Sequence, residues 1–204
     1  MAETEISLEL LAALRSVADL LDFTWEDNPP IWMLGGSCGL LLHGVALGRK
    51  PQDIDLYADM GAAERLHEAM SAYAVDNPVE DRSNGCYSLL SHYRIGGMSV
   101  ELVCGFQIYR GLSRYSVETV RLLRHASLQV IPEIGMLRLM PLAHELVFNI
   151  LRSRADRYKA ISSVMRMDMP RHLPPLQELI QHHQWGPSHM SVLEGQLDIT
   201  RANA

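Results

Sequence analysis

The segment from Ile31 to Tyr57 constrains the fold more than any other part of the chain. Ile31–Leu34 is a short apolar run typical of a buried strand, and Gly35-Gly36-Ser37 follows it directly. Ser37 is placed to cap a short helix through the leucines that follow, and Ile54–Tyr57 is a second strand. A strand that turns through two glycines into a helix and then returns as a strand predicts an α/β or α+β domain.

The rest of the chain predicts a small mixed sheet followed by a helical region. The expected elements are a helix over 5–22, a helix over 62–73 with Tyr73 facing inward, hairpin strands over 88–95 and 98–104 around Gly96-Gly97, weaker strands over 128–131 and 136–140, a helical stretch from Pro141 to about 169, and a last helix near 176–183. We therefore expect residues 1–140 to form a core that includes the N-terminal helix, and residues 141–204 to form a helical region packed on that core.

Composition limits the class of protein. A chain that is 48% hydrophobic and 21% charged falls in the globular range, which excludes a disordered or fibrous protein. Three cysteines give an odd number without Cys-x-x-Cys spacing, so we expect no disulfide framework and a cytoplasmic location. The acidic start, with Glu3, Glu5 and Glu9, is unlike a secretory leader. Glycines interrupt the long uncharged run over 31–48, so we expect no membrane partner.

Charge is unevenly distributed along the chain. Residues 110–171 hold eleven Lys or Arg against five Asp or Glu, a local balance of +6, and the whole chain is at −6, so the rest is at −12. Such a division suits a cleft with acidic metal ligands on one side and a cationic wall on the other. Arg-rich surface helices are the alternative explanation.

Asp53 and Asp55 are the most informative pair of residues. Side chains alternate along a strand, so both carboxylates point to one face while Ile54 and Leu56 point into the core. Two carboxylates this close favour a cation between them, and Mg²⁺ accepts such ligands while taking others from substrate phosphates. The alternative for the pair alone is an edge strand with a solvated polar face.

The residues around this pair favour a phosphate site. Glycines at 35 and 36 let the backbone approach a phosphate, helix N–H groups attract the anion, and Ser37 can donate to an oxygen. Downstream, Glu101 lies on the second strand of the Gly96-Gly97 hairpin, opposite in direction to Val100 and Leu102. If that strand neighbours the Asp53–Asp55 strand, Glu101 is a third carboxylate, and the set suits metal-assisted nucleotidyl transfer. The alternative for Glu101 is a stray acid on a hairpin.

These motifs resemble the signature of the polymerase-β-type nucleotidyltransferase superfamily, and within it the AbiEii-type group of abortive-infection and toxin–antitoxin proteins. The similarity covers roughly 31–165, and its specific part is the Gly-Gly-Ser to Asp-x-Asp block. It implies a polymerase-β-like fold, two Mg²⁺ ions held by Asp53, Asp55 and Glu101, and transfer of a nucleotide from an NTP. The acceptors it implies are an RNA end such as tRNA, a partner protein or a small molecule.

The resemblance also assigns the residues that bind the nucleotide. Phosphates are expected on Gly35, Gly36 and Ser37, with charge offset by Arg49 and by Arg157 and Lys159 on one helix.

The chain departs from the family pattern at several positions. Pro51 stands where Ser or Thr is frequent, Asn149 where a Lys reaches the triphosphate, and Ala160 where an Asp is usual. Glu101 is also longer than the usual Asp. Loss of a cationic phosphate contact weakens nucleotide binding, so a non-catalytic descendant that acts as an antitoxin or adaptor is an alternative function.

Two other kinds of site compete with this one. Gly35-Gly36-Ser37-Cys38-Gly39 also fits the Gly-x-Ser-x-Gly nucleophile elbow of serine hydrolases, but only one helix precedes Ser37, and such folds place several strands there. His182, His183 and His189 cluster near the end of the chain, but no carboxylate or cysteine lies near them at ligand spacing. We therefore expect a solvated helix end there.

Overall fold

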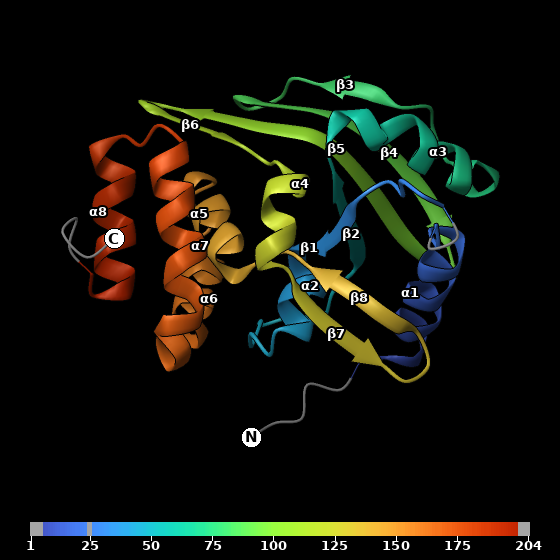
Figure 1. Ribbon diagram of the computed structural model, residues 1–204, viewed down its shortest axis with the longest axis horizontal. Coiled ribbons are helices and arrows are strands. Elements are labelled where there is room, and N and C mark those ends of the chain that lie inside the picture. Colours follow the sequence, from blue (N-terminus) through green and yellow to red (C-terminus); the bar gives the residue numbers. More distant parts are fainter. Residues whose placement is uncertain (1–5, 24–25, 200–204) are drawn as a thin grey trace.

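The computed structural model describes residues 6–23 and 26–199 of the 204, and within them a single mixed sheet carries helices on both faces (Figure 1). The sheet follows the order β3-β4-β5-β2-β1-β8-β7, with β6 paired to β5. Its strands are β1 (Trp32–Gly35), β2 (Asp53–Ala58), β3 (Val79–Asp81), β4 (Cys86–Ile95), β5 (Met98–Arg110), β6 (Ser113–Ser116), β7 (Ser127–Ile131) and β8 (Gly135–Leu139).

The helices gather into a group at the C-terminal end and a few elements on the sheet. They are α1 (Leu8–Leu20), α2 (Gly36–Leu42), α3 (Ala63–Met70), α4 (Thr119–Leu122), α5 (Leu142–Leu151), α6 (Ala155–Met165), α7 (Met169–His182) and α8 (Pro187–Leu197). In Figure 1, α5 to α8 stand together at one end of the molecule and α1 lies at the other. No helix in the described part of the chain is long and apolar enough to cross a membrane.

Strand β2 lies in the middle of the sheet and sets the geometry of the site. It runs antiparallel to β1, with Asp55 opposite Gly35, and parallel to β5, with Asp55 opposite Glu101. Because β2 is flanked on both sides, its backbone N–H and C=O groups are paired, and its side chains are held in fixed positions. Asp55 therefore lies between Gly35 of the glycine turn and Glu101 of the Gly96-Gly97 hairpin.

The alternation of β2 assigns its residues to two hydrophobic clusters. Ile54 and Leu56 are fully buried against the face covered by α1 and α3. Tyr57 packs on the opposite face with Phe148 and the other core residues of the C-terminal helices. Asp53 and Asp55 share the parity of Tyr57, so they lie on the side of the sheet that α5 approaches.

Most predicted elements are confirmed. The strand before the glycines, the strand bearing the two aspartates, the Gly96-Gly97 hairpin and the two weaker strands are β1, β2, β4–β5, β7 and β8. The predicted first helix is α1, shorter at its start, and residue 5 lies outside the described residues.

Other expectations are wrong in detail. Tyr73 is 44% exposed rather than inward, because α3 ends at Met70 and a 3₁₀ turn follows. The helical stretch from Pro141 breaks after α5, where Ser153 takes a positive φ of 56°. The helix predicted near 176–183 is α7, which begins earlier, at Met169, and contains Pro174 and Pro175 in its interior.

Ser37 does not cap α2. Gly35 is the N-cap residue and makes no side-chain cap, because the helix begins at Gly36. The Ser37 hydroxyl donates instead to Asp53 Oδ1 over 3.4 Å. The sequence pattern also did not predict β3, β6, α4 or α8, which lack a long periodic signal.

Candidate active site

The glycine turn and Asp55 are in direct contact. Gly36 has a φ of +58°, and a Cβ atom there would lie 1.7 Å from Asp55 Oδ2. A Cβ on Gly35 would lie 2.8 Å from Tyr57 Cε2 and 2.9 Å from Glu145 Oε1. Only residues without a side chain allow β1 to turn this close to the carboxylate of β2.

A cleft of about 520 Å³ opens on the Asp55 face of the sheet. Four of its acids come from β2, β5 and α5, namely Asp53, Asp55, Glu101 and Glu145. Its cations are Arg49, Arg152, Arg154 and Arg157, three of which lie around the junction of α5 and α6. The cleft therefore combines acids that come mainly from the sheet with cations that come mainly from the α5–α6 junction, although Glu145 and Asp156 are acids on those helices.

The charged groups of the cleft shift one another's pKa values. Burial, followed by the charges of Asp53 and Glu101, raises the pKa of Asp55 to about 7, against the lowering effect of Arg157 and Arg152. Burial and Asp53 also raise the pKa of Glu101. Burial and neighbouring arginines, chiefly Arg152, lower the pKa of Arg154. Groups with pKa values shifted by burial and close partners in a cleft are typical of functional sites.

Glu145 is a fourth acid, which the sequence motifs did not mark as a site residue. It is 2% exposed, and its Oε1 accepts a hydrogen bond of 2.9 Å from the Gly36 N–H. Burial and Asp55 raise its pKa to about 7, while the Gly36 N–H opposes that shift. An acidic residue on the inner side of an otherwise apolar helix is the sequence signal that could have found it.

Asn149 lies one helical turn beyond Glu145 and supports it. Its Nδ2 donates to the Glu145 carbonyl oxygen over 2.8 Å and to Glu145 Oε2 over 3.3 Å. Asn149 therefore holds Glu145 with an uncharged group. Arg152, Arg154 and Arg157 bring the positive charge into the cleft instead.

The predicted nucleotide-binding residues divide into two groups. Gly36, Arg49 and Arg157 line the main cleft. Ser37 lines an adjoining cavity of about 240 Å³, and the two cavities share Arg49, Asp53, Asp156 and Arg157. Gly35 and the exposed Lys159 are not among the lining residues of either cavity.

The donor set of the cleft fits Mg²⁺. Asp53, Asp55 and Glu101 offer only carboxylate oxygens, on neighbouring parallel strands. The pKa values of Asp55 and Glu101 are raised first by burial and then by like charges, and a bound cation would offset both effects. Their ligand atoms do not all lie within 4.8 Å of one another, whereas those of Glu118, His182 and His183 do. A wider arrangement still suits Mg²⁺, which keeps several waters and takes phosphate oxygens as further ligands.

Solved structures share this fold, although no protein-family model and no curated protein sequence matches the chain. A candidate nucleotidyltransferase from Thermotoga maritima, TM1012, aligns with a TM-score of 0.61 at 17% identity, over 80% of this chain and 96% of that one. The protein has the nucleotidyltransferase fold. The antibiotic-resistance factor ANT(2'')-Ia aligns with a TM-score of 0.52 at 10% identity, over 93% of this chain and 97% of that chain.

The nucleotidyltransferase fold confirms the predicted fold class and disfavours the hydrolase alternative. Ser37 is 6% exposed, and the hydrogen bond found for its hydroxyl goes to Asp53, with no histidine bonded to it in the described residues. A serine nucleophile needs a base within hydrogen-bond reach.

Proposed function

We propose that the protein is a Mg²⁺-dependent nucleotidyltransferase that moves an NMP from an NTP to a hydroxyl acceptor. The observation that carries the proposal is the register of β2 and β5, which sets Asp55 beside Glu101 in a cleft that Arg152, Arg154 and Arg157 also line. Carboxylates beside cations in one cleft meet the needs of nucleotidyl transfer, which is catalysed mainly by positioning and by charge stabilisation.

Asp53, Asp55 and Glu101 would hold the magnesium ions, which supply charge neutralisation at the phosphates and lower the pKa of the acceptor hydroxyl. The arginines of the α5–α6 junction and Arg49 would bind the phosphates and balance the charge that develops on the departing pyrophosphate. Glu101 is half-buried and lines the cleft. It would take the proton of the acceptor hydroxyl as the hydroxyl oxygen attacks the α-phosphorus of the NTP.

The acceptor defines the finer function. An RNA end, a protein hydroxyl and a small molecule all present a hydroxyl, and ANT(2'')-Ia is described as an antibiotic-resistance factor. The AbiEii-type resemblance implies a toxin–antitoxin or phage-defence setting in the cytoplasm, which stays part of the proposal.

The test compares the wild-type chain with Asp53→Asn/Asp55→Asn. Each labelled NTP is incubated with cell extract and Mg²⁺, and label is followed into the RNA, protein and small-molecule fractions. Wild-type protein is expected to transfer label into one fraction. The double variant is expected to do so about a thousandfold more slowly, because metal binding supplies several kcal/mol of transition-state stabilisation. An unchanged rate in the folded double variant would contradict the mechanism.

A second function, a nucleotidyltransferase-fold binding protein such as an antitoxin or adaptor, is favoured by two observations. The Gly36 N–H, which a phosphate would use, is bound to Glu145, and Asn149 stands where the family has a lysine. Calorimetry with a non-hydrolysable ATP analogue and Mg²⁺ distinguishes the two functions. Binding to the cleft supports the enzyme, and no binding at millimolar nucleotide supports the binding protein.

A further inference from the structure

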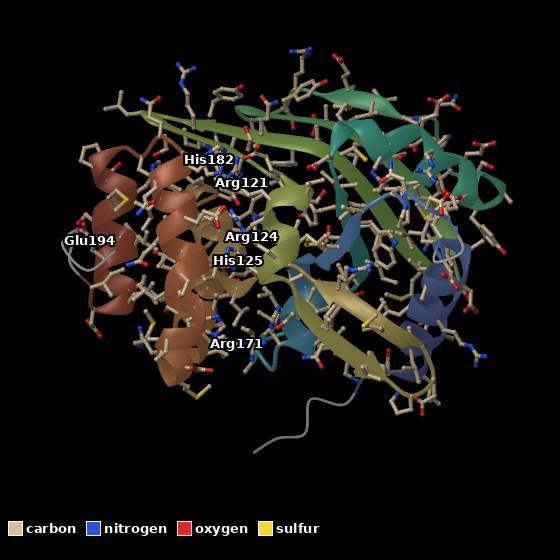
Figure 2. The ribbon with its side chains drawn as sticks, viewed as in Figure 1. Arg121, Arg124, His125, Arg171, His182 and Glu194 are labelled. Carbon is tan, nitrogen blue, oxygen red and sulfur yellow. The ribbon has the colours of Figure 1, made fainter. Side chains whose placement is uncertain are left out.

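Two histidines at the end of α7 meet a glutamate from a distant part of the chain. Glu118 is the N-cap residue of α4, His182 is the last residue of α7, and His183 follows it. One ligand atom from each lies within 4.8 Å of the others. Figure 2 shows His182 and Arg121 where the end of α7 faces α4. The expectation of histidines without a carboxylate partner is therefore wrong, because the fold brings Glu118 to them.

The contact between Glu118 and His182 is short but is not a hydrogen bond. His182 Nε2 lies 2.8 Å from Glu118 Oε2, yet this oxygen is buried and has no hydrogen-bond partner among the described residues. Buried polar atoms normally find a partner, and ligation of an ion is one of the standard reasons when they do not. The same oxygen forms an ion pair with Arg121, and neither contact is aligned as a hydrogen bond, so a cation bound by Oε2 and a neutral His182 Nε2 would satisfy both atoms.

His183 is held in place by aromatic packing. Its ring meets the Tyr115 ring edge-on, with 4.5 Å between centroids, and Tyr115 is itself 2% exposed. The Tyr115 hydroxyl and His144 Nδ1 are 2.6 Å apart in a hydrogen bond. A ligand whose ring orientation is fixed in advance loses less conformational entropy when a metal binds.

The donor set indicates the metal. Two imidazoles and one carboxylate, with a position left for water, form a recurrent zinc set, whereas Mg²⁺ and Ca²⁺ prefer oxygen ligands alone. None of the three residues lines the cleft that contains Asp53 and Asp55. We propose that Glu118, His182 and His183 bind one Zn²⁺ ion, which ties the end of α7 to the segment between β6 and α4.

Substitution of Arg121 is expected to strengthen zinc binding, the opposite of the effect expected for the ligands. Its Nε lies 3.3 Å from Glu118 Oε2, and its Nη1 lies 3.5 Å from Glu178 Oε1. The guanidinium therefore competes with a cation for Glu118, and Glu178 offers it another partner. Removing the charge with Arg121→Gln is expected to tighten zinc binding several-fold, while Glu118→Gln weakens it.

The experiment is calorimetric titration of Zn²⁺ into the untagged, chelator-treated full chain, together with a thermal-shift series. We expect one Zn²⁺ per chain at the new site, which persists in Asp53→Asn/Asp55→Asn. Binding should weaken about a hundredfold in His182→Ala and in Glu118→Gln. His189→Ala is the matched histidine control, because His189 bonds to Ser113 Oγ outside the cluster and should leave zinc binding unchanged.

Co²⁺ reports the geometry of the site independently. A four-coordinate cobalt complex absorbs strongly in the visible range, and its spectrum should disappear in His182→Gln, which preserves the helix end without the imidazole. Absence of zinc binding would overturn the proposal, as would binding that survives His182→Ala and Glu118→Gln. Because the readouts are binding and spectra, the outcome does not depend on whether nucleotide transfer is observed.

Discussion

Gly36 and Glu145 are joined by a buried hydrogen bond, although 109 residues separate them in the sequence. The bond connects the turn after β1 to the first turn of α5, so the glycine turn is held by the same helix that leads to Arg152, Arg154 and Arg157. Asp55 lies against Gly36 on the other side. The turn, the strand acid and the cationic helix junction are therefore mechanically linked, and a change at one is expected to affect the others.

Gly36→Ala tests this close approach. The new Cβ would overlap Asp55 Oδ2 and would also require a positive φ, so we expect a loss of about 2–4 kcal/mol in unfolding free energy and a displaced Asp55. Gly44→Ala is the matched control, because Gly44 has a φ of +75° but no atom lies within 4 Å of the position its Cβ would take, leaving only the backbone strain of about 1 kcal/mol. Chemical denaturation measures both, and equal losses would refute the role of the overlap.

Glu145→Gln tests whether this acid opposes nucleotide binding. The amide oxygen can still accept the Gly36 N–H, but the negative charge near the phosphate position is gone. We expect the nucleotide dissociation constant to fall about tenfold, which corresponds to removing one repulsive charge from a partly desolvated site. Calorimetry with an ATP analogue measures this, and weaker binding would show that Glu145 supports the turn more than it repels the ligand.

Asp55→Asn is expected to stabilise the metal-free protein while abolishing transfer. The folded-state pKa of Asp55, about 7, exceeds its ordinary value of 3.8, so the folded chain holds a proton that the unfolded chain has already released. The unfolding free energy therefore falls as pH rises from about 4 through 7. At pH 8 the ionised carboxylate lowers it by roughly 1–4 kcal/mol. Urea denaturation in EDTA should show this gain at pH 8 and almost none at pH 4. A destabilised variant at pH 8 would contradict the electrostatic explanation.

Strand periodicity made the sheet side of the site predictable. Alternation along β2 was enough to place Asp53 and Asp55 on one face, and the Gly96-Gly97 hairpin was enough to place Glu101 on a strand that could neighbour it. The sequence could not predict that β2 and β5 are neighbours, and their pairing had to be assumed. Periodicity indicates which face of a strand a residue lies on, but it does not indicate which strand lies next to it. Short elements such as β3 and α4 carry too few residues for a periodic signal.

Long-range contacts could not be predicted from the sequence. Glu145 is one acid in an apolar helix, and its role is defined by Gly36, which only the folded chain brings to it. The zinc candidate shows the same limit, since His182 and His183 had no partner at local ligand spacing until the fold placed Glu118 beside them. His43 is a further case, because the dipole at the end of α2 favours a charged imidazole, whereas burial by distant parts of the chain lowers its pKa to about 4.

Arg157 and Lys159 offer a paired test on one helix. Arg157 lines both adjoining cavities, whereas Lys159, two residues along α6, is exposed and lines neither. Arg157→Gln should lower kcat/KM for the NTP by about ten- to a hundredfold, the effect of one charge-assisted contact. Lys159→Gln should change it by less than about threefold. Steady-state kinetics on both variants decides the assignment, and a larger effect at Lys159 would show that the phosphates lie elsewhere.

The imidazole of His43 makes the stability of the fold sensitive to mild acid. His43 ends α2, and its Nε2 is 2.8 Å from the Met140 carbonyl oxygen. Burial lowers its pKa from 6.5 to about 4, ahead of the smaller opposing effect of that hydrogen bond. Between pH 6.5 and 4 the unfolded chain therefore takes up a proton that the folded chain excludes, so the unfolding free energy falls as pH falls, by up to roughly 3 kcal/mol for this residue. His43→Gln retains a donor for Met140 without titrating, and it should lose less stability than wild type between pH 7 and pH 4.5 in urea denaturation. Identical losses in the two proteins would mean that His43 takes up its proton without unfolding.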